Sequence, residues 1–281
     1  MTRRIRIGKI NYTNVWPIYH HFPHDRFEGR LEWIETVPSG LNKAMREGAI
    51  DMGAISSFAY GESFEQYELY PNLSVSANRD VNSILLFHRA PLRELDGAHI
   101  ALPTTSATSV NLLKIILHKF YGIAPHYEYA PPSLTDMMEH MDAALLIGDD
   151  AIRASWTDHG YMVTDLGREW RDLTDYGMTF AVWAVRKETI QRFPGTIAEI
   201  HEAFMESKRI GAANPASIIA SAQAVVGGEA EYWRHYFQHL NHDFGDIQQQ
   251  GLSLYFRYAH ELGYLQKDVP LQFWTDKTRV R

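Results

Sequence analysis

The chain has 281 residues, of which 45% are hydrophobic and 22% charged; this is typical of a globular protein of one or two domains and excludes disordered and fibrous classes. Its 27 basic and 34 acidic residues give a net charge of −7, which disfavours a general nucleic-acid or acidic-membrane binder. The absence of cysteine excludes thiol nucleophiles, iron–sulfur clusters, Cys-based zinc sites and disulfides.

The N-terminal segment MTRRIRIGKI is basic and then strand-like, and it lacks the apolar core of about 7–15 residues that a signal peptide needs. No run of about 18 apolar residues occurs anywhere in the sequence. We therefore expect a cytoplasmic protein whose partners include neither a membrane nor a nucleic acid.

The first part of the chain predicts strands at residues 5–10, 31–37 and 50–55, with a helix at 41–47. The polar loop Asn11-Tyr12-Thr13-Asn14 follows the first strand, and Ser56-Ser57 follows the third. This β–loop–α–β order is typical of a parallel α/β sheet, in which ligands bind beyond the carboxyl ends of the strands.

A second unit and a helical tail follow. The second unit is predicted to contain strands at 83–88, 99–102, 127–130, 143–147 and 180–185, with helices at 111–121 and 134–140. The tail is predicted to form four helices, at 196–213, 215–226, 229–240 and 247–262.

We therefore predict an α/β protein of two lobes. Lobe one comprises residues 1–87 and 182–281, so that it includes the helical tail, and lobe two comprises residues 88–181. The strands at 83–88 and 180–185 are expected to be the two crossovers. The cleft between the lobes is the expected ligand site, because small ligands often bind at domain interfaces.

Five sequence segments between residue 5 and about residue 187 occur in the order in which a known enzyme family has them. They are GKINYTNVWPIY, EGAIDMGAISSFAY, LPTTSATSVNLLK, MDAALLIGDDAI and WRDLTDYGMTFAVWAVRK. Together they resemble the menaquinone-biosynthetic chorismate dehydratases of the futalosine route. The chain departs from the family in one place: the family usually has Gly-Leu-Pro where this sequence has Asp175-Tyr176-Gly177-Met178, which leaves contacts from that segment open.

The resemblance implies a fold like that of the type II periplasmic binding proteins. It also implies a reaction, the conversion of chorismate to 3-[(1-carboxyvinyl)oxy]benzoate and water without a cofactor. A sister branch of the superfamily makes dihydroxynaphthoate, and its Ser-Pro-Cys-Pro-Asn-Asp opening is absent here.

Two residues are the expected catalytic ones. Asn14 lies in the loop after the first strand, where Asn commonly shapes a turn but where ligand contacts are also expected. It matches the Asn of the family. Ser83 begins a predicted crossover strand; it is either a cleft residue or a buried Ser bonded to backbone.

A substrate carboxylate site is expected at Thr105, Ser106, Thr108 and Ser109. Hydroxyls, free backbone N–H groups and the positive end of a helix dipole would meet there. The alternative is that these residues only cap the following helix. The resemblance favours the carboxylate site, since chorismate carries two carboxylates.

Other expected substrate contacts lie at strand ends. Ser39, Ser56 and Ser57 follow strands of lobe one, with simple turns as the alternative. Gly148 permits close backbone approach and is the expected contact from lobe two. Asp149 is expected to cap the next helix, because Asp is a preferred N-cap residue, and the alternative is that it accepts from a substrate hydroxyl.

We expect no metal site. His20, His21 and His24 form one group and His235, His239 and His242 another, but the second lacks the Glu of a His-Glu-x-x-His zinc motif. Walker, G-x-G-x-x-G and G-x-S-x-G motifs are also absent, so nucleotide-binding and serine-hydrolase functions lack support.

None of the matched residues is an obvious general base. We therefore hypothesise that the substrate's own enolpyruvyl carboxylate takes the C3 proton, while Asn14 and a hydroxyl such as that of Ser83 assist departure of the C4 hydroxyl. Two alternatives remain open: a non-catalytic solute-binding or sensor protein, and another enzyme acting on a different aromatic carboxylate. The protein is expected to be a monomer or a homodimer.

Overall fold

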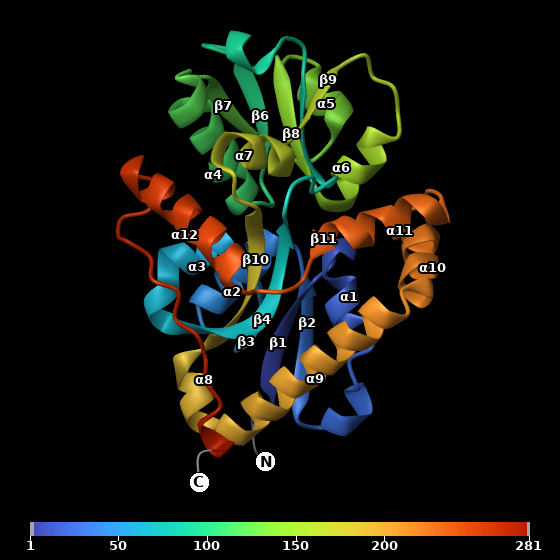
Figure 1. Cartoon of the computed structure of the whole chain (residues 1–281), viewed down its shortest axis with the longest axis vertical. Coiled ribbons are helices and arrows are strands. Elements are labelled where there is room, and N and C mark those ends of the chain that lie inside the picture. The colour runs from blue at the N-terminus through green and yellow to red at the C-terminus, as the bar shows by residue number, and fades with distance from the viewer. Residues whose placement is uncertain (1–2, 280–281) are drawn as a thin grey trace.

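The computed structural model describes residues 3–279 and is built around two β-sheets that lie one above the other (Figure 1). The first sheet has the strand order β11-β4-β10-β3-β1-β2. Its strands are β1 (Ile5–Ile10), β2 (Leu31–Thr36), β3 (Met52–Ser56), β4 (Tyr67–Ala77), β10 (Met178–Arg186) and β11 (Leu240–Asn241).

The first sheet is mixed rather than fully parallel. Strand β1 pairs in parallel with β2 and β3, as the β–loop–α–β pattern predicts. Strand β10 lies between β3 and β4 and is antiparallel to both. All of β10 except Arg186 is buried, which explains its continuous apolar sequence.

The second sheet has the order β7-β6-β8-β5-β9. Its strands are β5 (Ile84–His88), β6 (His99–Pro103), β7 (His126–Ala130), β8 (Ala143–Ile147) and β9 (Met162–Asp165). Strands β6, β7 and β8 are parallel, and β5 runs antiparallel to β8 and β9. The predicted α/β class with two sheets is thus confirmed.

The chain crosses between the sheets at residues 78–83 and 175–177. The expectation that residues 83–88 and 180–185 cross is wrong, because β5 pairs only within the second sheet and β10 only within the first. The physical reason is that these apolar strands need neighbours on both sides, whereas the polar turn residues can span the gap. The division into two lobes, with boundaries shifted by a few residues, remains our interpretation.

Helices cover both sheets. They are α1 (Trp16–Tyr19), α2 (Pro38–Arg46), α3 (Ser57–Ser63), α4 (Thr108–Ile115), α5 (Leu134–Met138), α6 (Gly148–Ser155), α7 (Leu166–Thr174), α8 (Lys187–Arg192), α9 (Pro194–Ala213), α10 (Ala216–Val225), α11 (Ala230–His239) and α12 (Asp246–Glu261). A turn of 3₁₀-helix, Thr13–Val15, precedes α1, and a π-helical segment, Ile116–Tyr121, continues α4. The last four helices confirm the predicted helical tail.

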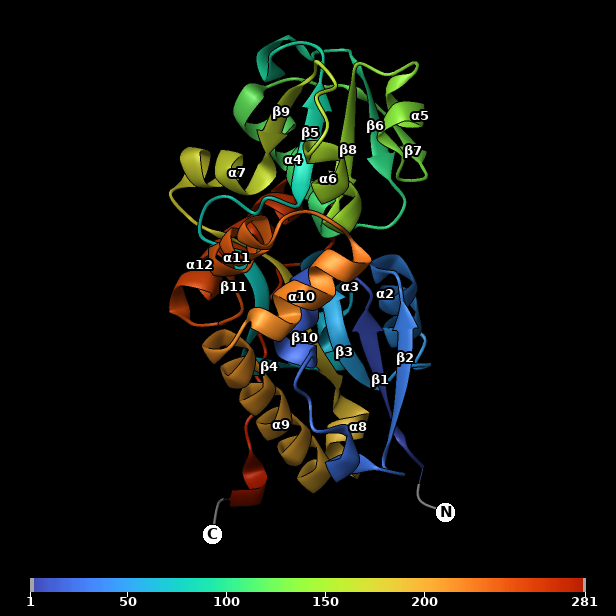
Figure 2. The ribbon, with the colours of Figure 1, turned by 90° about the vertical axis from the view of Figure 1, so that its right-hand side faces the viewer.

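The tail contacts both halves of the molecule. Figure 2 shows α11 and α12 at the level where the two halves meet. In α12, the Tyr255 hydroxyl donates to the carbonyl of Thr108, and Glu261 forms a 2.6 Å ion pair with Lys119. The tail therefore does more than cover the first sheet, because it also reaches the second half.

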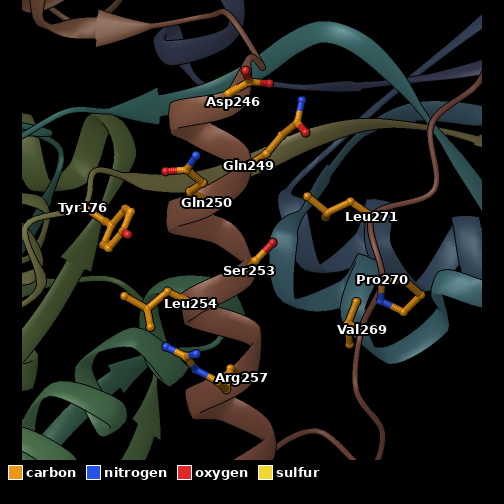
Figure 3. Close-up of a pocket in the computed structure, with 10 residues that line it drawn as sticks. All are labelled: Tyr176, Asp246, Gln249, Gln250, Ser253, Leu254, Arg257, Val269, Pro270 and Leu271. Carbon is orange, nitrogen blue, oxygen red and sulfur yellow. The ribbon is translucent and has the colours of Figure 1, made fainter.

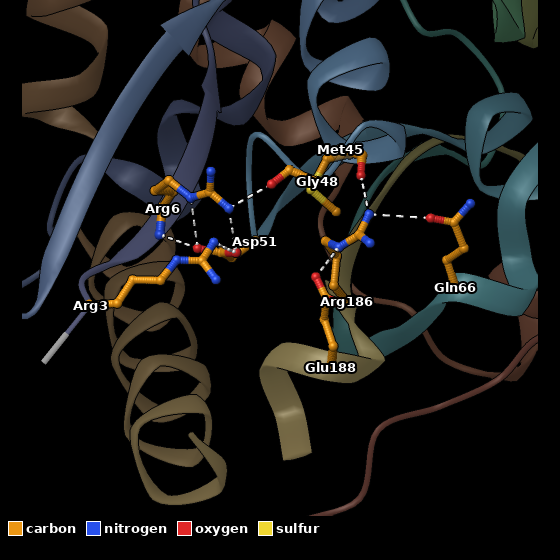
Figure 4. A network of polar contacts seen from close by, with 8 residues as sticks. All are labelled: Arg3, Arg6, Met45, Gly48, Asp51, Gln66, Arg186 and Glu188. Carbon is orange, nitrogen blue, oxygen red and sulfur yellow. Dashed lines mark hydrogen bonds and ion pairs between the residues drawn. The ribbon is translucent and has the colours of Figure 1, made fainter. Parts of the chain in front are cut away.

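A polar network ties together strand ends at the side of the first sheet away from the second (Figure 4). The Asp51 carboxylate, 2% exposed, accepts from the guanidinium groups of Arg3 and Arg6 at 2.8 Å and from the Arg6 backbone N–H. Burial acts to raise the pKa of Asp51, but these hydrogen bonds and charges outweigh it and lower that pKa. Arg186 in turn donates to the carbonyl of Met45.

Candidate functional site

The sequence-predicted site residues come from segments that meet between the two sheets. In the first half most of them follow β1 and β3, and in the second half they follow β6 and β8; Ser39 follows β2 and Ser83 precedes β5. The Phe58 N–H donates to the Thr108 hydroxyl at 2.9 Å, and the Thr13 hydroxyl donates to Asp149 at 2.6 Å. The structure thus brings the carboxyl ends of strands from both sheets together, where ligands of such sheets bind.

Asn14 is held in place through its backbone while its side chain remains unpaired. Its carbonyl oxygen accepts from the Nε2 of His242 at 2.7 Å. Its carboxamide oxygen is buried and has no hydrogen-bond partner among residues 3–279. Burial lowers the pKa of His242 to about 4, so its ring is neutral at ordinary pH. The Nε2–H of this neutral ring donates the hydrogen bond to the Asn14 carbonyl. An unpaired buried oxygen is costly, which favours a ligand as its partner.

Ser83 is buried at the end of the first crossing. Its contacts match the alternative of a buried Ser bonded to backbone, and its catalytic role stays a prediction. Its hydroxyl donates to the carbonyl of Val81 at 3.2 Å and accepts from the Tyr236 hydroxyl at 3.0 Å. Burial raises the pKa of Tyr236, which keeps this phenol protonated and able to donate. Tyr236 is in α11, and no local sequence pattern pointed to it, because the contact arises only when the tail folds back.

Ser56 and Ser57 are buried and make internal hydrogen bonds. The Ser56 hydroxyl caps α3 by accepting from the Ala59 N–H, and it also accepts from the side chain of Asn42. The Ser57 hydroxyl donates to the carbonyl of Thr179 at 2.7 Å. These internal hydrogen bonds match the alternative that Ser56 and Ser57 only shape the local backbone. Ser39 lies partly exposed in the first turn of α2. The substrate contacts expected of all three stay predictions.

The hydroxyl-rich segment before α4 is only partly used for capping. The N-cap of α4 is Ala107, and the Ser106 hydroxyl accepts from the Ser109 N–H at 3.3 Å. The hydroxyl oxygen of Thr105 is buried and interacts with the Tyr12 phenol, but it makes no hydrogen bond of ordinary geometry among residues 3–279. Like the Asn14 oxygen, it is a polar atom that a bound ligand would satisfy.

Gly148 and Asp149 both face the loop that carries Asn14. Gly148 has a φ of +59°, and a Cβ built on it would lie 3.0 Å from the ring of Tyr12. The expectation that Asp149 caps α6 is wrong, because the N-cap is Ile147 and the Asp149 carboxylate instead accepts from the N–H and hydroxyl of Thr13. Burial raises the pKa of Asp149.

The histidine groups separate in the structure. His235 and His239 are neighbours on α11, with tilted rings whose centroids are 3.9 Å apart, while His242 is hydrogen-bonded to Asn14. No group of three His, Asp or Glu side chains within residues 3–279 is arranged to hold a metal ion. No helix in that same range is long and apolar enough to cross a membrane.

Comparison with known proteins decides the family. The profile of a family described as menaquinone biosynthesis matches residues 5–261. The chain belongs to this family. The resemblance seen in the five sequence segments is thereby confirmed.

Two curated proteins that are similar to this chain are both named chorismate dehydratase. Chorismate dehydratase of Thermus thermophilus is 31% identical over 264 residues, which cover 89% of this chain and 93% of that protein. Chorismate dehydratase of Campylobacter jejuni is 26% identical over 203 residues, covering 69% of this chain and 75% of that protein.

Solved structures support the fold of this menaquinone biosynthesis family member. The protein AF1704 from Archaeoglobus fulgidus superposes with a TM-score of 0.76 at 18% identity, covering 93% of this chain and 98% of its own. The periplasmic aliphatic sulphonate binding protein of Escherichia coli superposes with a TM-score of 0.71 at 17% identity, covering 99% and 94%. The predicted periplasmic-binding-protein-like fold is confirmed.

The segment that departs from the family pattern lies at the second crossing. Asp175 ends α7 with a φ of +64°, and Tyr176 lines a cavity of about 520 Å³ on the outer side of α12 (Figure 3). The other lining residues are Asp246, Gln249, Gln250, Ser253, Leu254, Arg257, Val269, Pro270 and Leu271. None of the site residues expected from the sequence, all within the described range, lines this cavity. Asp175 and Tyr176 of this segment are exposed at the surface, whereas Gly177 and Met178 are buried.

Proposed function

We propose that this chain is a chorismate dehydratase, which converts chorismate to 3-[(1-carboxyvinyl)oxy]benzoate and water in menaquinone biosynthesis. The observation that carries the proposal is the near full-length similarity to the Thermus thermophilus protein of that name, within a family described by menaquinone biosynthesis. The Campylobacter jejuni relative carries the same name.

The reaction is a balanced elimination. The C3–H and C4–O bonds of the ring break, the proton and the hydroxyl leave together as water, and the ring becomes aromatic. No electron acceptor or donor is consumed, so side chains and substrate groups suffice. Aromatisation supplies the driving force, and the protein has to supply orientation and to limit competing rearrangement of the enolpyruvyl ether.

We assign catalytic roles to Asn14 and Ser83 as part of this proposal. The unpaired, buried carboxamide oxygen of Asn14 supports its role, since bound substrate would complete its hydrogen bonding. The substrate's enolpyruvyl carboxylate takes the C3 proton and passes it to the departing C4 hydroxyl, which leaves as water. Asn14 holds that hydroxyl, together with the Ser83 hydroxyl once its bond to Val81 is redirected. The hydroxyls and N–H groups of Thr105, Ser106, Thr108 and Ser109 receive a substrate carboxylate.

The direct test is incubation of the purified protein with chorismate, without added metal or nucleotide, followed by liquid chromatography and mass spectrometry. We expect time-dependent loss of the mass of one water and the appearance of aromatic absorbance. Buffer and heat-denatured protein serve as controls for spontaneous decay. Chorismate that is neither bound nor consumed would contradict the proposal.

Replacing Asn14 by Ala is expected to lower kcat at least about 100-fold, as loss of one preorganised polar group commonly does, with a much smaller change in KM. Asn11→Ala, which alters an exposed Asn of the same loop, is the matched control and should retain the wild-type rate. Initial rates of aromatic product formation measure both. A near-normal rate for Asn14→Ala would rule out its catalytic role.

A second candidate function is non-catalytic binding of a small aromatic carboxylate. The observation favouring it is the fold similarity to a sulphonate binding protein. The incubation experiment separates the two, because a binding protein would return chorismate bound but unchanged. The cytoplasmic location and the monomer or homodimer state expected from the sequence stay predictions.

A further inference from the structure

Asp149 is a buried carboxylate that the proposed chemistry does not use. Its side chain is 6% exposed and lies in the first turn of α6, directly after the second-sheet strand β8. A buried charge is expensive unless it is paired or hydrogen-bonded. A group of this kind at the meeting point of two halves is therefore a candidate for a function.

The partner of Asp149 comes from the other half of the molecule. One carboxylate oxygen accepts from the Thr13 hydroxyl at 2.6 Å and from the Thr13 N–H at 3.3 Å. Thr13 is fully buried, and the two residues are 136 positions apart in the chain. A hydrogen bond from a hydroxyl to a carboxylate is among the stronger ones in proteins.

This bond lies one residue before Asn14. Thr13 and Asn14 belong to the same 3₁₀ turn, so fixing one restricts the other. The tail holds the same turn through His242, which donates to the Asn14 carbonyl. Tyr12 packs against Gly148, the residue before Asp149. The turn that carries Asn14 is thus held by the second half of the molecule on one side and by the tail on the other.

The hydrogen bonds that Asp149 and His242 make to this turn differ in which sheet each of the two residues follows. His242 follows β11, a strand of the first sheet, whereas Asp149 follows β8 of the second. Only the Asp149 bond therefore depends on the approach of the two halves. We propose that Asp149 is a positioning residue, whose carboxylate binds Thr13 when the two halves come together and so orients the Asn14 carboxamide for the reaction.

The inference rests on the proposed dehydratase function and has a kinetic test. In Asp149→Ala and in Thr13→Val, we expect kcat to fall at least about tenfold with KM changed by less than about threefold, because orientation acts on the chemical step. Asp149→Asn keeps an acceptor oxygen and Thr13→Ser keeps a donor hydroxyl, so each should stay within about threefold of wild type. The double variant Thr13→Val with Asp149→Ala should lose no more than either single variant.

The matched control is Asp150→Ala. Asp150 is the next residue of α6 and pairs with Arg153 on the surface at 3.3 Å. It should retain wild-type kcat. Thermal unfolding of every variant separates a loss of orientation from a loss of fold. If Asp149→Ala does not fold, Thr13→Val still tests the inference, because it removes only the hydroxyl that donates to Asp149.

Hydrogen–deuterium exchange provides a readout that needs no substrate. The Thr13 amide donates to Asp149, so its exchange should be at least about tenfold faster in Asp149→Ala than in wild type, and near wild type in Asp149→Asn. If wild type does not convert chorismate, the proposed function fails while this measurement still decides whether Asp149 restrains the turn. Unchanged kcat or unchanged exchange in Asp149→Ala would overturn the inference. So would an Asp149→Asn variant as slow as Asp149→Ala, which would assign proton transfer to the carboxylate.

Discussion

Gly148 determines how closely one side chain of the first half approaches the second half. Its φ of +59° lies in the left-handed region, and the Tyr12 ring occupies the space where a Cβ would stand, at 3.0 Å. The sequence predicted a substrate contact at this glycine, and that contact stays a prediction. The structure shows that the approaching group is a side chain of the loop that carries Asn14.

We therefore expect Gly148→Ala to lower kcat about tenfold or more, because a displaced Tyr12 shifts the neighbouring turn. Steady-state kinetics with chorismate measures this effect. Gly97→Ala is the control, since Gly97 has a similar φ of +68° but open space around it. It should share the backbone strain, about 1–2 kcal/mol, without the kinetic loss. Equal kinetic effects of the two changes would argue against a role for the Tyr12 contact.

Asn14 and Asp149 differ in whether their side-chain oxygens already have a hydrogen-bond partner in the protein. The carboxamide oxygen of Asn14 is buried without a hydrogen-bond partner within residues 3–279, so it is suited to a ligand. The Asp149 carboxylate is already bonded to Thr13. This difference is why we assign Asn14 to the substrate and Asp149 to positioning.

Strands β1 and β3 are tied together at their starts by Asp51. The carboxylate bridges Arg3 and Arg6 of the first strand region from the residue before β3. Because its pKa is lowered in the folded state, ionised Asp51 stabilises the fold above the unfolded-state pKa, and this contribution is lost as pH falls through the folded value.

Asp51→Asn is accordingly expected to lower the free energy of unfolding by about 1–3 kcal/mol at neutral pH, since the arginines are partly exposed and the pair is partly screened. The difference from wild type should shrink as pH falls below the ordinary aspartate pKa. Urea unfolding at several pH values measures it. A difference that does not depend on pH would contradict the assigned ion-pair contribution. The rate with chorismate should change little, because Arg6 lies near the start of β1 whereas Asn14 follows the end of that strand.

The whole molecule has two halves joined at residues 78–83 and 175–177. Asp165 fixes the first crossing to the second half, because its carboxylate accepts from the N–H groups of Val81 and Asn82. Contacts such as Thr13 to Asp149 join the halves away from these crossings. An arrangement of this kind permits hinge motion, with the contacts made on closure.

We expect the radius of gyration to fall when chorismate or its product is added, because bound ligand stabilises the closed arrangement. Small-angle X-ray scattering on protein with and without the product measures this change. Asp149→Ala should compact less at the same ligand concentration. Identical scattering profiles with and without saturating ligand would remove closure from the account of the reaction.

The sequence by itself determined many of the elements and the family, but it did not predict β4 or β9. Its periodicity located β1, β2 and the four tail helices to within a few residues, because each depends on local patterns of apolar residues. The five ordered segments identified the family, and they contain Asn14, Ser56, Ser57, the Thr105–Ser109 segment and Gly148.

Only the tertiary structure decided which of these residues meet and what else reaches them. The sequence did not show that β10 inserts between β3 and β4, since strand partners are chosen by long-range packing. It missed Tyr236 and His242, because the tail brings them to Ser83 and Asn14 from more than 150 positions away. It assigned Asp149 to a helix cap, a local role, because its partner Thr13 is distant in the chain. Local patterns encode elements, and the contacts that position chemistry form only when those elements pack together.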